Sequence, residues 1–339
     1  MGASPPLVSV ILPAYNAQTT LGATLASVQA QTHENLEIIV VDDGSTDTTH
    51  DLVVAVQASD SRVRLIRQAN AGVAAARNRA LLEARGDWIA PLDADDLWHP
   101  QKLARQLSRL TLNPSAGVCY CWSVDIDMAS RVTERRLLVP LFEGWVYDEL
   151  LLDNFLSNSS SPLIRVEDAR SVGGWDTALR DANAQGCEDW DFYLRLARVT
   201  PFQLEPGFLV GYRQSDTAMS RDIRRMRRSH ALVMARQPAS CTESCPHALR
   251  RSVALNSLYL GKLALASGRP FAAIALFLEA VAHAPRLILT RPVLRDLKTL
   301  VLSRARCSSA GQSRGDIMFA DLDPNLPAMA RNIIALRGA

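Results

Sequence analysis

The sequence lacks any apolar run long enough to cross a membrane. A spanning helix needs roughly 18 apolar residues, and the most apolar stretch, residues 271–284, is interrupted by Glu279 and His283. The N-terminal segment MGASPPLVSV has neither a basic start nor a long apolar core, so we expect no secretory signal peptide. These absences predict a cytoplasmic protein, with peripheral attachment to the inner face of the membrane as the alternative.

Paired cysteines are also missing. The six cysteines are scattered, and none stands in a CxxC pair. Cys241 and Cys245 resemble half of a metal site, but no second pair of ligands follows at a suitable distance. This excludes a disulfide-bonded scaffold and a zinc ribbon, and we expect buried or unreactive thiols in a reducing compartment.

A glycine-rich nucleotide loop is absent after the first predicted strand. That strand, VSVIL (8–12), runs into PAYNAQTT (13–20), whereas a dinucleotide-binding Rossmann domain needs GxGxxG there. A nucleotidyltransferase that makes sugar nucleotides needs a glycine-rich loop with Arg and Lys for a triphosphate. PAYNAQTT has neither glycine nor a basic residue, which weighs against both classes.

The net charge of +2 hides an uneven distribution. Residues 1–220 hold 18 Lys and Arg against 28 Asp and Glu, whereas residues 221–339 hold 19 against 7. An acidic part followed by a basic part predicts two units with different surroundings. We therefore expect a larger domain over 1–220 and a basic C-terminal region over 221–339.

Short β-branched runs alternate with helical patterns in the first part of the chain. The predicted strands are 8–12, 36–41, 63–68 and 88–92, and the predicted helices are 20–30, 47–58, 72–84 and 100–110. This rhythm is typical of right-handed βαβ units in an α/β fold with a mostly parallel sheet flanked by helices. Farther on, we expect a helix over 189–197 and a closing strand over 208–213.

Three aspartates stand where the fourth predicted strand ends. The sequence there is LDADD (92–96), and like charges this close repel one another and are costly to bury. Asp93 and Asp95 are two residues apart, so on an extended chain their side chains point to the same side. Carboxylate oxygens are typical ligands of Mg²⁺ or Mn²⁺, which usually complete their shell with substrate phosphates. The motif predicts a divalent cation site at the carboxyl end of the sheet, where α/β proteins bind ligands.

Polar residues also follow the other predicted strands. Tyr15 is placed to stack on a base, and the adjacent carboxylates Asp42 and Asp43 exceed what capping of the next helix requires. A carboxylate in this position can accept a hydrogen bond from the N–H of a base or from a ribose hydroxyl. Arg77 is either a solvated helix charge or a clamp for an anionic nucleotide.

Four motifs, VSVILPAYN, IIVVDDGSTD, NAGVAAARN and the DxD-containing LDADD, resemble in order and spacing the nucleotide-sugar half of family 2 glycosyltransferases with the GT-A fold. The likeness is close over about 7–110 and weaker over 111–220. It implies inverting, metal-dependent transfer from a nucleotide sugar, with UDP as the expected nucleotide. It implies donor-binding roles for Pro13, Ala14, Tyr15, Asn16, Asp43, Asn70, Arg77, Asp93 and Ala94. Asp95, together with Asp93, would hold Mn²⁺ or Mg²⁺.

A glycine-aromatic motif lies in the expected acceptor half. GGWDTAL (173–179) resembles the family's GG-aromatic-D element. The resemblance implies acceptor-side roles for Trp175 and Asp176. Trp175 has two interpretations, a platform for a sugar ring or a packed core residue.

An acidic pair follows in CEDWDFYLRLA (187–197). It resembles the family's later ED pair, which supplies the general base, and we expect Asp189 to be the base and Glu188 to face the acceptor or a backbone N–H. The pair also suits a helix N-terminus, where the dipole favours negative charge. Both interpretations are compatible, because a helix start holds a carboxylate rigidly.

The family's frequent YR-x-H element after the closing strand differs here. The chain has Tyr212, Arg213 and Gln214 at that place, so a histidine metal ligand is not expected. Arg213 or Ser220 is the candidate for contact with the donor phosphates. No QxxRW element is present, which favours single transfers over processive synthesis.

The basic region is predicted to be helical. Residues 254–287 resemble one tetratricopeptide unit, a helical hairpin that must pack on neighbours to bury its face, and the composition of 307–327 predicts a loose linker. RDIRRMRRSH (221–230) and the amphipathic stretch 287–306 are rich in basic residues. They are a solvated face, a surface that docks on the acidic domain, or an attachment to an anionic membrane. Nucleic acid is not expected as a partner, because these basic stretches contain no aromatic residues between the basic ones.

The partners implied by the resemblance are a nucleotide-sugar donor and a saccharide or lipid-linked acceptor. The biological setting implied is synthesis of cell-surface polysaccharide or glycoconjugates. The alternatives are the nucleotidyltransferase already weighed and a non-catalytic scaffold that acts through the helical region. The presence of both the DAD and the ED carboxylates argues against a scaffold, which has no need of either.

Overall fold

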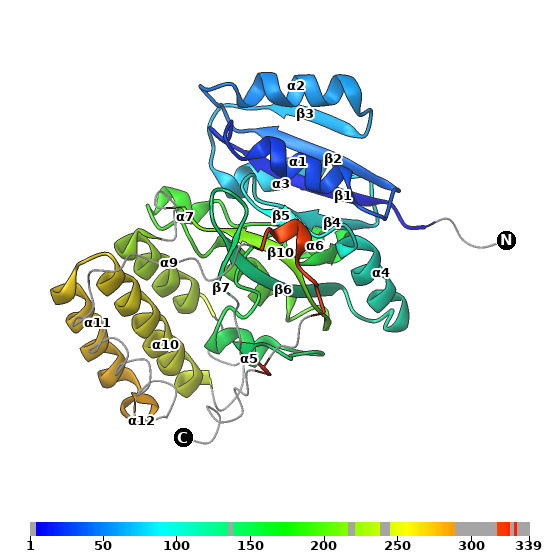
Figure 1. The fold of residues 1–339 in the computed structure, drawn as a ribbon. Coiled ribbons are helices and arrows are strands. Elements are labelled where there is room, and N and C mark those ends of the chain that lie inside the picture. The colour runs from blue at the N-terminus through cyan, green and yellow to red at the C-terminus, as the bar shows by residue number, and fades with distance from the viewer. Residues whose placement is uncertain are drawn as a thin grey trace.

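A mixed sheet forms the centre of the structure (Figure 1). The structure is a computed structural model that describes residues 5–134, 138–215, 221–237, 245–288, 317–325 and 329–330. Within these residues the strand order is β3-β2-β1-β4-β9-β6-β10-β5, and β7 pairs with β6 at the side.

The first half of the sheet is parallel. Its strands are β1 (Val8–Ala14), β2 (Leu36–Asp42), β3 (Val63–Arg67) and β4 (Trp88–Pro91), and the helices between and after them are α1 (Leu21–Gln29), α2 (Thr49–Ser59), α3 (Val73–Glu83) and α4 (Lys102–Leu112). Each of these elements lies within two residues of its predicted bounds. Alternate residues of β1 enter different cores, Val10 on one face and Ile11 on the other. A strand covered on both faces requires the continuous apolar run seen in the sequence.

The second half of the sheet mixes directions. β6 (Val118–Ile126) and β10 (Phe202–Arg213) are parallel to each other, whereas β9 (Leu163–Arg165) runs antiparallel between β4 and β6 and joins the two halves. Two short strands complete this half, β5 (Leu97–Trp98) beside β10 and β7 (Val132–Glu134) beside β6. The helices here are α5 (Tyr147–Leu152), α6 (Val166–Ser171), α7 (Ala178–Asp181) and α8 (Glu188–Leu196).

The described residues between 221 and 288 form a helical layer at one end of the molecule (Figure 1). Its helices are α9 (Ile223–Ala235), α10 (Cys245–Ala266), α11 (Pro270–His283) and α12 (Pro285–Ile288). α10 and α11 form a tight hairpin, because Gly261 leaves room for the Phe277 ring, which would lie 2.6 Å from a Cβ at that position. The likeness to a tetratricopeptide unit stays a prediction. None of the described helices is both long and apolar enough to cross a bilayer.

The chain then returns to the sheet domain. Residues 317–325, which include the short helix η3 (Phe319–Asp321), lie against β7 and β10, and the Phe319 ring packs over Gly211. A two-residue strand, β11 (Met329–Ala330), pairs with β8 (Leu138–Val139). The expectation of a loose linker is therefore wrong for 317–325, because Phe319 is a buried anchor. The rest of that linker, 307–316 and 326–327, lies outside the described residues, as does the basic stretch from 289 to 306.

Candidate active site

The acidic turn after β4 is fixed by its last aspartate. Asp96 is fully buried, and its carboxylate accepts hydrogen bonds from the Ser160 hydroxyl and from the backbone N–H of Arg213 at 2.9 Å. Burial raises the pKa of Asp96, and the charges of Asp95 and Asp93 add to the rise. Asp96 thus ties the turn to the end of β10 and to the 158–161 loop, which leaves Asp93 and Asp95 for other partners.

The Asp95 carboxylate receives no hydrogen bond from the side chains that the structure describes. The Arg213 guanidinium donates instead to the Asp95 backbone carbonyl, with an Nε–O distance of 2.6 Å. Burial, followed by the nearby charge of Asp93, raises the pKa of Asp95 to about 6. The ionised carboxylate is therefore under-compensated, and added positive charge would stabilise it.

This donor set fits a divalent cation of the Mg²⁺ or Mn²⁺ type. Asp95 supplies hard oxygen atoms beside a second carboxylate, Asp93, and such ions commonly take one or two carboxylates plus substrate phosphates. Within the described ranges, no group of three His, Cys, Asp or Glu side chains is arranged to hold a metal. Any ion at this turn would consequently need oxygen atoms from a bound ligand or from water to complete its coordination.

One buried arginine joins the donor-side turn to the acceptor half. Arg77, on α3, is 3% exposed, and its Nη2 donates to Asp93 Oδ1 at 2.6 Å and to the Ser159 hydroxyl at 2.7 Å. Its Nη1 donates to Asp189 Oδ1 at 2.7 Å. The fork of a guanidinium suits such a bridge, because it is always charged and its donors are rigidly placed. Arg77 is thus not a solvated helix charge; it is the link between Asp93 and Asp189.

Asp189, in the first turn of α8, is held through a single oxygen. The Trp175 indole N–H donates to the same Oδ1, at 3.0 Å, that Arg77 contacts. No described residue donates to Oδ2, and the side chain keeps 23% of its surface exposed. Burial raises the pKa of Asp189 to about 6, and the Arg77 charge opposes this rise. An oriented carboxylate with one open oxygen and a pKa near 6 is suited to accept a proton at neutral pH.

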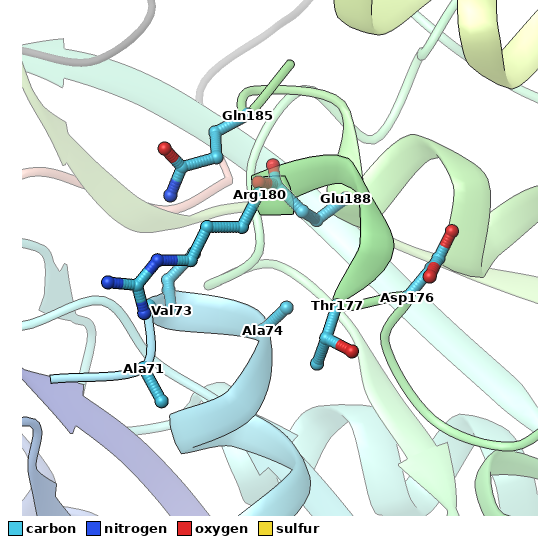
Figure 2. Close-up of a pocket in the computed structure, with 9 residues that line it drawn as sticks. Ala71, Val73, Ala74, Asp176, Thr177, Arg180, Gln185 and Glu188 are labelled. Atoms are coloured by element: carbon cyan, nitrogen blue, oxygen red, sulfur yellow. The ribbon is translucent and has the colours of Figure 1, made fainter. Parts of the chain in front are cut away.

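Glu188 faces a hollow between the start of α3 and α7 (Figure 2). Its Oε2 accepts the Gly186 N–H at 2.7 Å, and burial raises its pKa. The hollow is shallow and partly open to solvent, and it is lined by Ala71, Gly72, Val73, Ala74, Asp176, Thr177, Arg180, Gln185 and Glu188. Figure 2 shows Arg180 reaching from α7 toward Ala71 and Val73, and its guanidinium donates to Asn70 at 2.8 Å. The hollow therefore lies beside residues expected to bind the donor.

The predicted nucleoside residues gather at the carboxyl ends of β1 and β2. Asp43 is buried and accepts the backbone N–H groups of Ala71 and Gly72 at 2.8 and 2.7 Å, so it fixes the start of α3. Tyr15 is 52% exposed, and Asn16 accepts the Thr46 N–H at 2.9 Å. Pro13 and Ala14 end β1, and the Ala94 carbonyl accepts the hydroxyls of Thr20 and Thr24.

The two predicted acceptor-side residues have different surroundings. The Trp175 ring is 2% exposed and packs on Phe192 with a centroid distance of 4.1 Å, which is the geometry of a core residue. Asp176 caps the backbone N–H of Ala178 and forms an ion pair with Arg236, the residue that follows α9. Trp175 contributes to the site through its indole N–H, while Asp176 links it to the helical layer.

Sequence reasoning did not identify the roles of Ser159, Ser160 and Asp96. Their partners are far away in the chain, with Ser159 on Arg77 and Ser160 on both Asp96 and the backbone N–H of Asp93. The only available signal was the unusual run SSS at 159–161, which by itself is typical of a loop. Of the two residues considered for phosphate contact, Arg213 lies at the acidic turn and Ser220 falls outside the described residues.

Comparison with known proteins identifies the family of this chain. Residues 9–160 match the family model described as glycosyl transferase family 2. The chain is 46% identical over 187 residues to the Escherichia coli UDP-Glc:alpha-D-GlcNAc-diphosphoundecaprenol beta-1,3-glucosyltransferase WfgD, covering 52% of this chain and 71% of that protein. It is 46% identical over 152 residues to a putative teichuronic acid biosynthesis glycosyltransferase, TuaG, of Bacillus subtilis, covering 44% of this chain and 59% of that relative.

Solved structures show the same fold at low identity. A mannosyltransferase from Pyrobaculum calidifontis, in complex with GDP-Man and Mn²⁺, aligns with a TM-score of 0.53 and 20% identity over 89% of this chain and 87% of that one. S. aureus TarS 1-349, in complex with UDP-GlcNAc, aligns with a TM-score of 0.54 and 13% identity over 80% and 88%. The fold is thus of the GT-A type, and the chain belongs to glycosyltransferase family 2.

Proposed function

We propose that this protein transfers a sugar from a nucleotide-sugar donor, with UDP as the expected nucleotide, to a saccharide or lipid-linked acceptor, with inversion, in the synthesis of a cell-surface polysaccharide or glycoconjugate. The observation that carries the proposal is the Asp93–Arg77–Asp189 bridge. It places a predicted donor-binding carboxylate and a predicted base on the two sides of one buried guanidinium. In a single displacement the leaving group and the incoming nucleophile lie on opposite sides of the sugar, and a rigid link between donor-binding and base residues favours that positioning.

On the donor side, Asp95 is the residue that would hold the cation. A divalent ion there would neutralise charge on the departing diphosphate. Arg213 places a second positive charge at the same turn, and its guanidinium contacts backbone carbonyls and a hydroxyl rather than carboxylates. We assign Arg213 to the donor phosphates.

On the acceptor side, Asp189 accepts the proton of the attacking hydroxyl through Oδ2. Arg77 and Trp175 hold Oδ1, so the open oxygen is oriented before the acceptor binds. Glu188 lines the hollow and orients the acceptor or its own loop through Gly186. Positioning of this kind contributes to catalysis because the carboxylate need not be reorganised during proton transfer.

The acceptor class rests on the relatives. WfgD is named for a diphosphoundecaprenol-linked acceptor and TuaG for teichuronic acid biosynthesis. A lipid-linked acceptor would lie at a membrane, and the basic region, with 19 Lys and Arg against 7 acidic residues, suits attachment to an anionic surface. We therefore place the enzyme at the cytoplasmic face of a membrane, bound peripherally.

Donor binding tests this function. Isothermal titration calorimetry with UDP-, GDP- and dTDP-sugars should give Mn²⁺-dependent binding for at least one donor in the unaltered protein. Asp95→Asn should abolish that dependence. Product analysis by NMR should show an inverted anomeric centre, and a retained configuration would reject the mechanism.

The same variant carries its own folding control. The pKa of Asp95 lies near 6 in the folded protein, above its ordinary value of 3.8, so ionisation between about pH 4 and 6 destabilises the fold. Asp95→Asn removes this penalty and should melt at a higher temperature than the unaltered protein at pH 7 without ligands, with the difference vanishing below pH 4. Metal-dependent donor binding that persists in this well-folded variant would exclude Asp95 as the ligand.

A further inference from the structure

The outward side of α11 carries an unusual surface. Apart from the terminal His283, every exposed residue of this helix is apolar, and these residues are Phe271, Ala272, Ile274, Ala275, Leu278, Val281 and Ala282. We call them the α11 outer face. Phe271 is 86% exposed and Leu278 is 63% exposed. A helix on the surface of a globular protein normally turns charged and polar residues to this side.

The inner side of α11 already accounts for its packing. Ala273, Leu276 and Ala280 are buried in the helical layer, and Phe277 fits against Gly261 of α10. The outer face is therefore not required to hold the hairpin together. A contiguous exposed apolar patch of this kind is typical of a contact surface for a membrane or another molecule.

Basic side chains lie beside α11 and at both of its ends. The described residues of 221–288 contain eleven Lys and Arg but two acidic residues, Asp222 and Glu279, and both acids have arginine partners. Glu279 of α11 pairs with Arg227 of α9 at 2.6 Å, so Arg227 lies beside α11. Arg269 and Arg286 are exposed just before and just after the helix. Figure 1 shows α11 at the outer edge of the helical layer.

We propose that the α11 outer face is the surface by which this protein binds an anionic lipid bilayer. The apolar side chains would enter the boundary between headgroups and acyl chains, and the arginines at both ends and on α9 would contact lipid phosphates. This inference deepens the proposed function and rests on it, because a lipid-linked acceptor is presented at a membrane.

The positive charge beside the α11 outer face favours one of its three possible binding partners over the other two. A second copy of the chain would bring two arginine-bordered surfaces together, and like charges repel. Residues 289–316 of the chain itself contain six Lys and Arg against two Asp, so covering the face with them would add positive charge beside positive charge. An anionic bilayer offers apolar and negative groups together, which complements both features of the surface.

Vesicle co-sedimentation tests the proposal. The full chain should sediment with phosphatidylcholine vesicles that contain phosphatidylglycerol, should do so less at high salt, and should stay in solution with pure phosphatidylcholine. The double variant Phe271→Ser, Leu278→Ser should lose at least about tenfold in partitioning to the anionic vesicles. The matched control is Leu82→Ser, Leu112→Ser, which alters two residues of the sheet domain that are 73% and 78% exposed and should leave partitioning unchanged.

Three results would overturn the proposal. Unchanged partitioning of the α11 variant would place membrane binding elsewhere or nowhere. Light scattering that shows a dimer of the unaltered chain, converted to a monomer in the variant, would identify a second copy as the occupant. A marked fall in melting temperature of the variant in the absence of lipid would identify the chain's own residues as the cover.

Failure of the proposed function is distinguishable from failure of this surface. Transfer to a soluble saccharide acceptor is measured without vesicles in the unaltered chain and in both variants. Absence of transfer in all three would contradict the enzymatic proposal and leave the vesicle result to stand. Normal transfer together with lost sedimentation in the α11 variant alone would support both proposals.

Discussion

The sheet domain and the helical layer differ in the kind of side chain that lowers their stability. In the sheet domain, charges are buried and compensated, as with Arg77 between Asp93 and Asp189. In the helical layer, apolar side chains stand in solvent along α11. Burial of charge and exposure of apolar surface each reduce the stability of a fold. Each therefore indicates a place where something other than folding has shaped the sequence.

Different contacts would offset the buried charge of the sheet domain and the exposed apolar surface of the helical layer. Added positive charge would stabilise the ionised carboxylate of Asp95, because burial and Asp93 raise its pKa to about 6. Contact with an apolar neighbour would remove the α11 outer face from water. The comparison predicts that changes in the sheet domain alter chemistry, while changes in the helical layer alter stability or location.

The largest expected effect is on turnover. Asp189→Asn removes the proton acceptor while keeping the hydrogen bonds to Oδ1, and it should lower kcat at least about 100-fold with donor affinity unchanged. The measurement is steady-state transfer alongside donor calorimetry. Asp181→Asn, at the exposed end of α7, is the matched control and should retain full turnover. If Asp189→Asn keeps normal turnover and Glu188→Gln loses it, the roles of the two carboxylates are reversed.

A smaller effect is expected when the bridge between the two halves is altered. The Arg77 charge lowers the pKa of Asp189 against the effect of burial, so Arg77→Gln should raise that pKa above about 6. The base must be ionised, so the acid limb of the kcat–pH profile should move to higher pH. Arg77→Lys keeps the charge but loses the three-way fork, and should lower kcat about tenfold with a smaller shift of the limb. An unmoved limb in Arg77→Gln would show that Asp189 is not the group that titrates.

The smallest expected effect lies in the helical layer. Gly261→Ala places a methyl group 2.6 Å from the Phe277 ring, and overpacking of this kind costs about 1–3 kcal/mol. The variant should unfold at a lower temperature, while transfer to a soluble acceptor stays unchanged. Ala272→Gly, on the outer face of α11, is a control for helix propensity alone, at about 1 kcal/mol. A large loss of transfer in Gly261→Ala would contradict the separation of the two regions.

Much of the donor half was predictable because its site residues directly follow parallel strands. Once 8–12, 36–41 and 88–92 are read as neighbouring buried strands, their carboxyl ends must lie side by side, which places Tyr15, Asp43 and Asp93 at the same edge of the sheet. Local periodicity is sufficient for this step. The short antiparallel strand β9, in contrast, has only three residues, and nothing in its sequence indicates that it joins the two halves of the sheet.

The remainder of the site was harder to predict because its contacts are long-range. Arg77 lies 112 residues from Asp189, and Ser159 lies 82 residues from Arg77. No local pattern distinguishes an arginine that bridges two carboxylates from one that is solvated. Asp96 presents a related difficulty, since LDADD shows three equivalent aspartates and only the structure separates the buried anchor from the open Asp95.

The return of residues 317–325 changes how the helical layer should be regarded in engineering. The chain leaves the sheet domain at Gln214, whose N–H donates to the Ile126 carbonyl, and re-enters at Ile317, whose carbonyl accepts the Val132 N–H. Ile126 and Val132 are paired across β6 and β7. The helical layer is thus an insertion with closely spaced ends rather than a tail, and its helix α9 contributes Val233 and Met234 to the core of the sheet domain. A shortened chain would therefore have to keep residues 317–325 as well as α9. Simple truncation at residue 221 would instead remove Phe319 from above Gly211 and uncover the closing strand of the sheet domain.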